Sequence, residues 1–456
     1  MTKTIETIAA SAVSTGENSI NDHISALRFI TCGSVDDGKS TLIGRLLVDS
    51  RAVLQDHLAG VTRSGEVDLA QLTDGLSSER EQGITIDVAY RYFATEERKF
   101  IIGDAPGHEQ YTRNMVTAAS QADAAVVLVD ATKLDWQNPQ LELLVQTRRH
   151  SLLVHLLRVH SLVFAVNKLD AVADPSQAFT NIRAALLRFA QDAGIQVAAT
   201  VPVSALEGWN VVNPHPGWCG YQGHSLLQVL ELLPHTPADT QLPLAFPVQW
   251  VEKSASSSAD TRQGRRVFWG RVAAGSVAPG AQVSLFPSGQ KAVVAQVLDH
   301  ARRPTGVDAG SSAGIVLDRE VDVSRGDWIL AAPSAAAPAD DEFDAPVEHS
   351  AWPGRREISA TVAWMDDEPL VVGRVYWALH GHRWVKAKVR RVVHCLNIHT
   401  LAKEGAHQLE PNAIGHVELV LQEPLPVAAF EQARVLGALI LVDQASHKTA
   451  GAVLAH

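Results

Sequence analysis

The stretch GSVDDGKSTLIGRLL, residues 33–47, decides the fold of the first part of the chain. It fits the pattern G-x-x-x-x-G-K-[ST] through Gly33, Gly38, Lys39 and Ser40. It follows the strand-like run LRFIT and opens a helix-like run, which is the context that a phosphate-binding loop needs. Glycines let backbone N–H groups surround phosphate oxygens, and the helix N-terminus adds donors and positive charge. The predicted phosphate contacts are Gly33, Ser34, Val35, Asp36, Asp37, Gly38, Lys39, Ser40 and Thr41.

A second motif, DAPGH, directly follows the strand-like run KFIIG. Lys39 is expected to reach the β- and γ-phosphates, and Ser40 to ligate Mg²⁺. A carboxylate at a strand end beside this loop, here Asp104, is positioned to bind the metal. Gly107 provides a flexible peptide that can sense a γ-phosphate. Taken alone, the motif also fits a simple strand-to-turn connection; as a site it comprises Asp104, Ala105, Pro106 and Gly107.

The motif NKLD, residues 167–170, indicates which base is bound. Its carboxylate, Asp170, can accept hydrogen bonds from N1–H and the 2-amino group of guanine, which adenine does not offer in that arrangement. The alternative is a helix N-cap at Asp170. Ser204, Ala205 and Leu206 follow another strand-like run and would direct a backbone N–H toward the guanine O6. The nucleotide predicted is therefore GTP, held at the base by Asn167, Lys168, Leu169 and Asp170.

Element patterns divide the chain into three folded parts. From residue 27 to about 233, apolar strand-like runs alternate with helical patterns, which predicts a mostly parallel sheet with helices on both faces. A strand is expected from Ile86 to Phe93. After Pro243, short alternating segments broken by Gly and Pro are typical of a small antiparallel barrel or sandwich, and barrels are the prediction made here. The expected order is a tail (1–24), an α/β P-loop GTPase domain (25–240), a β-barrel (241–332), a linker (333–348) and a second β-barrel (349–456).

Charge and composition narrow the possible partners. A net charge of −11 argues against a broad nucleic-acid surface, so no nucleic acid is expected. The most basic stretch, residues 380–394, is interpreted as a solvated strand face or a protein interface. The three cysteines lie far apart, which is typical of a reduced protein. A polar N-terminus and the lack of a long apolar run predict a cytoplasmic protein that does not enter membranes.

The order of these motifs resembles that of GTPases of the translation-factor superclass, and the run EREQGITIDVAYRYF, residues 79–93, narrows the resemblance. In that class the threonine of the GIT sequence binds Mg²⁺ and closes over the γ-phosphate, which implies this role for Thr85. The histidine after DAPG orients the attacking water, which implies that His108 is catalytic. Val35 and Ile84 match the apolar pair that flanks this histidine.

Within the superclass, the chain resembles the GTPase large subunit of bacterial sulfate adenylyltransferase (subunit 1, CysN-type). The resemblance rests on residues 33–47, on EQGITIDVAYRYF, on DAPGHEQYTRNM and on QTRRHS, with Ser34 where translation factors usually have histidine. FPVQW, LFPSG and VDVSRGDWIL extend it into the second part, and the third part matches more loosely. Ala105 departs from the commoner Thr of the family motif, a mild change because the backbone carries the role.

The resemblance implies a heteromer that uses GTP and Mg²⁺. A smaller catalytic subunit forms adenylyl sulfate and pyrophosphate from ATP and sulfate, and GTP hydrolysis by the large subunit drives this uphill reaction. The alternatives are an elongation-factor-like GTPase that delivers aminoacyl-tRNA, and a GTP-gated binding module. The chain has one Gly-Lys pair, so no fused kinase is expected. Residues 131–146 form a longer connection than usual, interpreted as a loop rather than as a partner surface.

Overall fold

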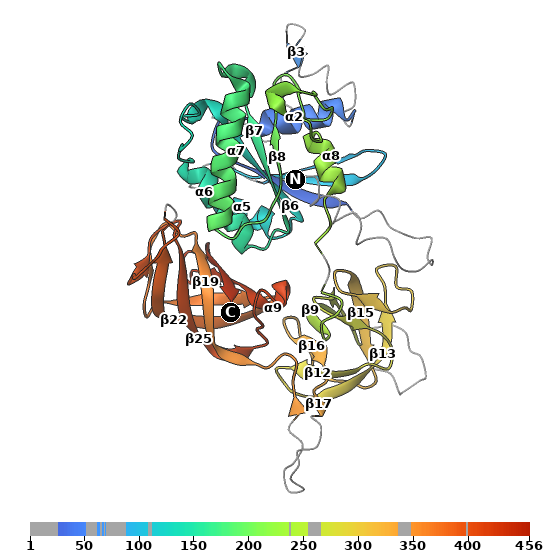
Figure 1. The fold of residues 1–456 in the computed structure, drawn as a ribbon. Helices are drawn as coiled ribbons and strands as arrows, with labels where there is room; N and C mark the ends of the chain where they lie inside the picture. Colours follow the sequence, from blue (N-terminus) through green and yellow to red (C-terminus); the bar gives the residue numbers. More distant parts are fainter. Residues whose placement is uncertain are drawn as a thin grey trace.

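This computed structural model describes residues 26–51, 62–63, 66–67, 69, 88–107, 112–236, 239–253, 266–335, 348–397 and 400–456. The chain forms an α/β unit followed by two β units (Figure 1). In Figure 1 the α/β unit lies above, and the two β units lie beside one another below it. Among the described residues, no helix is both long and apolar enough to cross a bilayer.

The α/β unit is built on a six-stranded sheet in the order β4-β5-β1-β6-β7-β8. All neighbouring strands pair in parallel except the edge pair β4–β5, which is antiparallel. The mostly parallel sheet is therefore as predicted, although the strand expected from Ile86 begins at Ala89, and residues 86–87 lie outside the described residues. The strands are β1 (Leu27–Cys32), β4 (Ala89–Ala94), β5 (Lys99–Asp104), β6 (Ala124–Asp130), β7 (Ser161–Asn167) and β8 (Val197–Pro202).

Helices cover both faces of this sheet, as expected for a sheet of parallel strands (Figure 1). Leucines of α2 (Lys39–Asp49) and α8 (Leu226–Leu232) pack on one face. The other face is covered by α5 (Thr112–Ala119), α6 (Val145–Leu156) and α7 (Pro175–Asp192). The central strands β6 and β7 are buried along their whole length, so the ends of these strands are held firmly.

The second unit is a closed antiparallel barrel in the order β10-β15-β13-β12-β16-β9, which confirms the barrel predicted here. A small ladder of β11 (Ser276–Val277) and β14 (Val307–Asp308) lies beside it. The barrel strands are β9 (Ala245–Lys253), β10 (Arg266–Arg271), β12 (Gln282–Phe286), β13 (Lys291–Leu298), β15 (Ser312–Leu317) and β16 (Trp328–Ala331).

The third unit is a seven-stranded antiparallel sheet in the order β21-β26-β27-β19-β25-β22-β23. Strand β21 pairs with β26 on one side and with β22 on the other, so the first strand of this order also contacts the sixth. On β22 the basic residues Lys386 and Lys388 are exposed and alternate with buried residues. The strands are β19 (Arg355–Trp364), β21 (Val375–His380), β22 (Arg383–Leu396), β23 (Lys403–Glu404), β25 (Ile414–Leu425), β26 (Ala438–Val442) and β27 (Thr449–Ala455).

Short elements complete the described chain. Residues 131–146, interpreted as a loop, contain one 3₁₀ turn, an irregular stretch up to residue 144 and the first two residues of α6. The two ends of the predicted linker pair with each other as β17 and β18. The short elements are β2 (Thr62–Arg63), β3 (Glu66–Val67), η2 (Ala131–Lys133), η3 (Leu169–Ala171), η4 (Trp218–Gly220), β17 (Ser334–Ala335), β18 (Glu348–His349), β20 (Leu370–Val371), β24 (Gln408–Leu409) and α9 (Arg434–Gly437).

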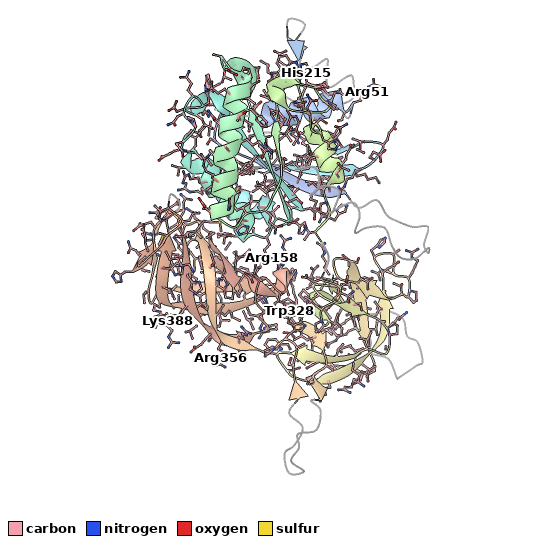
Figure 2. The ribbon with its side chains drawn as sticks, in the orientation of Figure 1. Arg51, Arg158, His215, Trp328, Arg356 and Lys388 are labelled. Carbon is pink, nitrogen blue, oxygen red and sulfur yellow. The ribbon has the colours of Figure 1, made fainter. Side chains whose placement is uncertain are left out.

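Side chains connect the three units through backbone carbonyls and stacked rings. Arg158 of the α/β unit donates to the carbonyl of Phe430 at 2.5 Å, and Figure 2 places it at this junction. Arg434 donates in return to a carbonyl of the α/β unit, that of Leu157, at 3.2 Å. Between the two β units, Trp328 stacks on His380 with ring centroids 4.9 Å apart. The α/β unit therefore rests directly on the third unit.

Candidate functional site

The loop of residues 33–38 connects β1 to α2 at the carboxyl end of the sheet. Gly38 is the N-cap of α2 and has φ 92°, in the left-handed region that favours glycine. Asp36 also has a positive φ, of 64°. These two residues curl the loop tightly in front of the first helical turn, as a phosphate-binding loop requires.

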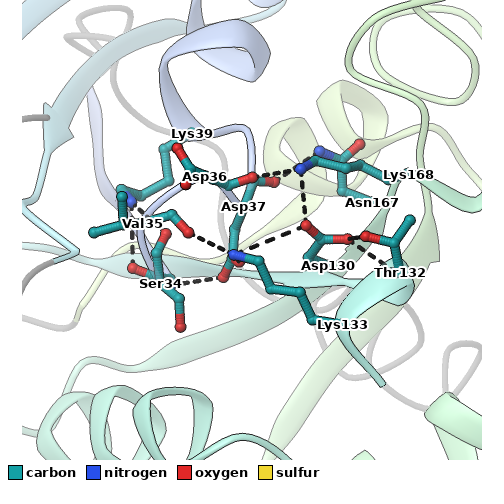
Figure 3. Close-up of polar contacts among 11 residues, drawn as sticks. Ser34, Val35, Asp36, Asp37, Lys39, Asp130, Thr132, Lys133, Asn167 and Lys168 are labelled. Carbon is teal, nitrogen blue, oxygen red and sulfur yellow. Dashed lines mark hydrogen bonds and ion pairs between the residues drawn. The ribbon is translucent and has the colours of Figure 1, made fainter. Parts of the chain in front are cut away.

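Side-chain nitrogens hold five consecutive carbonyls of this loop. Three lysines and one asparagine from different elements act as donors (Figure 3). The pairs are Lys39 Nζ with the oxygens of Gly33 (3.2 Å) and Ser34 (2.8 Å), Lys133 Nζ with Val35 (2.5 Å), Lys168 Nζ with Asp36 (2.5 Å), and Asn167 Nδ2 with Asp37 (2.8 Å).

The carbonyl groups of the loop thus accept hydrogen bonds from side chains, which leaves backbone N–H groups at the start of α2 for a ligand. Within the described ranges, the N–H groups of Lys39, Ser40 and Thr41 donate to no protein group, as is normal for a first helical turn. Donors at a helix N-terminus, with a lysine among them, form a ready anion site. The residues present therefore fit a phosphate group.

The motif DAPG packs directly against this loop. Asp104 ends β5 and is 3% exposed, and its Oδ1 accepts a hydrogen bond from Thr31 Oγ1 at 3.2 Å. Gly107 lies so close to the loop that a Cβ atom there would be 2.6 Å from both the oxygen of Gly33 and Lys39 Nζ. The parallel pairing of Thr31 with Asp104 brings the two motifs together.

The base motif lies at the end of β7, beside the loop. Asn167 donates to the oxygen of Asp37, and its Oδ1 accepts the N–H of Ala205 at 3.0 Å. One side chain therefore joins the phosphate loop to the stretch 204–206. Asp170 is exposed in η3, and Leu206 is 64% exposed, so both face the solvent at this edge.

Three residues that the sequence motifs do not include contribute to the site. Asp130 ends β6 in register with Asn167 and lies 2.8 Å from Lys168 Nζ. Lys133 follows in η2, and Arg45 of α2 donates to the carbonyls of the stretch 204–206. The signal for Asp130 was a carboxylate at the end of a strand next to β1; Lys133 and Arg45 gave no comparable signal.

Burial and charge act against each other in this cluster. Burial lowers the pKa of Lys39, although Asp104 and Asp37 oppose this effect. Burial raises the pKa of Asp37 against the effect of Lys133. Burial would also raise the pKa of Asp130, but its hydrogen bonds with Lys168 and Thr132 lower it overall. The charges around the loop are thus balanced in pairs.

Three residues with predicted roles are not part of the chain that the structure describes. His108, Thr85 and Ile84 fall outside the described residues. In the described part of the chain, no group of three His, Cys, Asp or Glu residues could hold a metal ion. A magnesium ion that takes most of its ligands from phosphates and water needs fewer protein ligands, and Ser40 and Asp104 are of the right type.

Family models match two parts of the chain. Residues 25–237 match the elongation factor Tu GTP binding domain. Residues 357–454 match the GTP-eEF1A C-terminal domain-like family. Among solved structures, sup35 complexed with GDP aligns over 97% of this chain and 96% of its own, at 21% identity and a TM-score of 0.39.

Curated relatives match almost the whole chain. Sulfate adenylyltransferase subunit 1 of Laribacter hongkongensis is 42% identical over 93% of this chain and 84% of its own length. The subunit 1 of Salmonella typhi is 41% identical over 94% of this chain and 85% of its own. The bifunctional enzyme CysN/CysC of Xylella fastidiosa is 44% identical over 93% of this chain, which spans 65% of that enzyme's length.

Proposed function

The chain belongs to the sulfate adenylyltransferase subunit 1 family, and we propose that it is the GTP-hydrolysing subunit of such an enzyme. The family resemblance carried by its motifs is confirmed, and these relatives favour this function over delivery of aminoacyl-tRNA. In this proposal a separate, smaller catalytic subunit forms adenylyl sulfate and pyrophosphate from ATP and sulfate. GTP hydrolysis on this chain drives that reaction.

One observation supports GTP binding most strongly. Asn167 bonds both to the phosphate loop and to the stretch 204–206, so the motifs for phosphate and for base form one continuous site. In this site the N–H groups around Gly38 would hold the phosphates, and Asp170 would accept hydrogen bonds from guanine. The Ser204–Leu206 backbone would lie beside the base, and Arg45 holds it by donating to the carbonyls of Ala205 and Leu206.

Magnesium would supply charge neutralisation at the phosphates when bound. Ser40 and Asp104 would hold it, together with Thr85, which lies outside the described residues. Gly107 would sense the γ-phosphate through its peptide, because it already contacts the phosphate loop. His108 would orient the attacking water. These roles follow the family motif residue by residue.

A reconstituted reaction tests the proposed coupling. The full chain is mixed with the smaller catalytic subunit, ATP, sulfate and pyrophosphatase, and adenylyl sulfate is measured with and without GTP. We expect GTP to raise the yield, and a non-hydrolysable GTP analogue to leave it low. An unchanged yield with GTP would contradict the coupling. Filter binding of charged tRNA that depends on GTP would favour the elongation-factor alternative.

His108→Ala is expected to lower GTP turnover by roughly 10²- to 10⁴-fold, the usual contribution of a positioned acid–base group. Nucleotide affinity should remain largely intact, because the water-orienting role acts in the transition state. Phosphate release and binding of a fluorescent GTP analogue measure the two quantities. His160→Ala is the control, because His160 is an exposed histidine of the same unit. Wild-type turnover in His108→Ala would remove this residue from the mechanism.

A further inference from the structure

Lys133 contacts the phosphate loop from the turn that follows a neighbouring strand, and it belongs to none of the sequence motifs. It ends η2, the turn that follows β6. Asp130 caps this turn, because its Oδ1 accepts the N–H of Thr132 at 2.9 Å and the Thr132 hydroxyl at 2.6 Å. The capped turn directs the Lys133 side chain toward the loop of residues 33–38 (Figure 3).

The Lys133 ammonium makes two short contacts with the loop. It donates to the oxygen of Val35 at 2.5 Å and to Asp37 Oδ1 at 2.9 Å. The Lys133 side chain is 34% exposed, whereas the Asp37 side chain is completely buried. Asp130 Oδ2 lies farther from the ammonium, at 3.9 Å. Lys133 therefore binds both the backbone of the loop and its buried carboxylate.

Asp37 creates an electrostatic conflict within a phosphate-binding loop. Its Oδ2 accepts the N–H of Ser34 at 2.6 Å, so the carboxylate shapes the loop. Its negative charge nevertheless lies beside the place where phosphates would bind, and like charges in a buried site repel strongly. Lys39 is the other nearby cation, but the phosphates would need its ammonium. Among the described residues, the cation that forms an ion pair with the Asp37 carboxylate is Lys133.

The chain after Lys133 fixes this turn in place. Leu134, Leu141 and Leu143 are buried against the α/β core. Asn181 of α7 donates to the carbonyl of Trp136 at 2.9 Å, and Arg188 of the same helix donates to that of Pro139 at 3.2 Å. The long connection is thus a docked loop, and it holds the base of the Lys133 side chain rigidly.

We infer that Lys133 is a positioning residue of the nucleotide site. Its ammonium neutralises the buried Asp37 carboxylate and holds the Val35 carbonyl, so that the loop can accept the phosphates of GTP. The inference rests on the proposed GTP binding. It assigns to this lysine a role separate from that of Lys39, because Lys133 acts through the loop and not on the phosphates.

The test is a set of variants of the full chain, titrated with a fluorescent GTP analogue. Lys133→Met keeps the length of the side chain and removes its charge. We expect about 10- to 100-fold weaker binding, the range of one lost charge-assisted hydrogen bond together with an uncompensated carboxylate. KM for GTP should rise while kcat is retained, as for lost uniform binding. Lys133→Arg should restore most of the affinity, and Lys388→Met, on the distant β22, is the control.

Asp37→Asn separates charge neutralisation from a merely structural role. If Lys133 neutralises Asp37, then Lys133→Met should cost far less affinity in the Asp37→Asn background. An equal loss in both backgrounds would overturn the inference, as would wild-type affinity of Lys133→Met. Should the single variant not fold, the double variant still must fold and bind GTP. Failure of the unmodified chain to bind GTP would overturn the proposed function as well, so the two failures are distinguishable.

Discussion

Asp170→Asn is expected to change the base preference of the chain from guanine to xanthine. The carboxylate of Asp170 would accept two hydrogen bonds from guanine. In the variant, the NH₂ group of asparagine would face one of these guanine N–H donors, so that hydrogen bond would be lost. Xanthine carries an oxygen where guanine carries its amino group, so the new amide can donate to it. A site built to hydrogen-bond its ligand discriminates by about 10⁴-fold, and we expect a shift of that order in the GTP:XTP affinity ratio.

Competition between the two triphosphates for a fluorescent nucleotide measures this ratio. Asp174→Asn is the matched control, because Asp174 caps α7 by accepting the N–H of Gln177 at 3.0 Å. Asparagine caps helices about as well as aspartate, so this variant should keep both fold and guanine preference. Retained guanine preference in Asp170→Asn would show that Asp170 does not read the base.

The sequence predicted the parts of the site that depend on local pattern. Each motif follows a buried strand, and parallel strands bring their carboxyl ends to one edge. The grouping of Gly38, Asp104 and Asn167 therefore followed from strand order alone. The sheet, its helices and the first barrel could be predicted from another local pattern. Apolar periodicity reports which face of a helix or strand is buried.

The contacts between strand ends could not be predicted. Lys133 meets Asp37 because β1 and β6 pair in parallel with Cys32 opposite Val127, which places the segments that follow these strands side by side. Register is a property of two strands together, so no single stretch reveals it. The same limit applies to the third unit, where β21 pairs with the distant β26. The alternation of apolar and polar residues in these strands shows which face is buried, but it does not show which strands pair with one another.

Gly38→Ala is expected to disrupt both halves of the nucleotide site. Gly38 has φ 92°, where a residue with a Cβ atom is strained by about 1–2 kcal/mol. A Cβ atom there would also lie 2.5 Å from Asn167 Nδ2. The asparagine would have to move, and it would lose its bonds to the Asp37 oxygen and to the Ala205 N–H.

Gly194→Ala separates backbone strain from steric collision. Gly194 has φ 70°, but apart from its chain neighbours no atom of the described residues lies within 4 Å of a Cβ added there. Both variants should lower the melting temperature, whereas only Gly38→Ala should weaken GTP binding. The loss of the two Asn167 hydrogen bonds, at about 1 kcal/mol each, together with the displaced loop, predicts a loss of at least about 30-fold. Titration with a fluorescent GTP analogue and thermal unfolding measure the two effects. Equal GTP affinity in the two variants would show that the hydrogen bonds of Asn167 do not contribute to GTP binding.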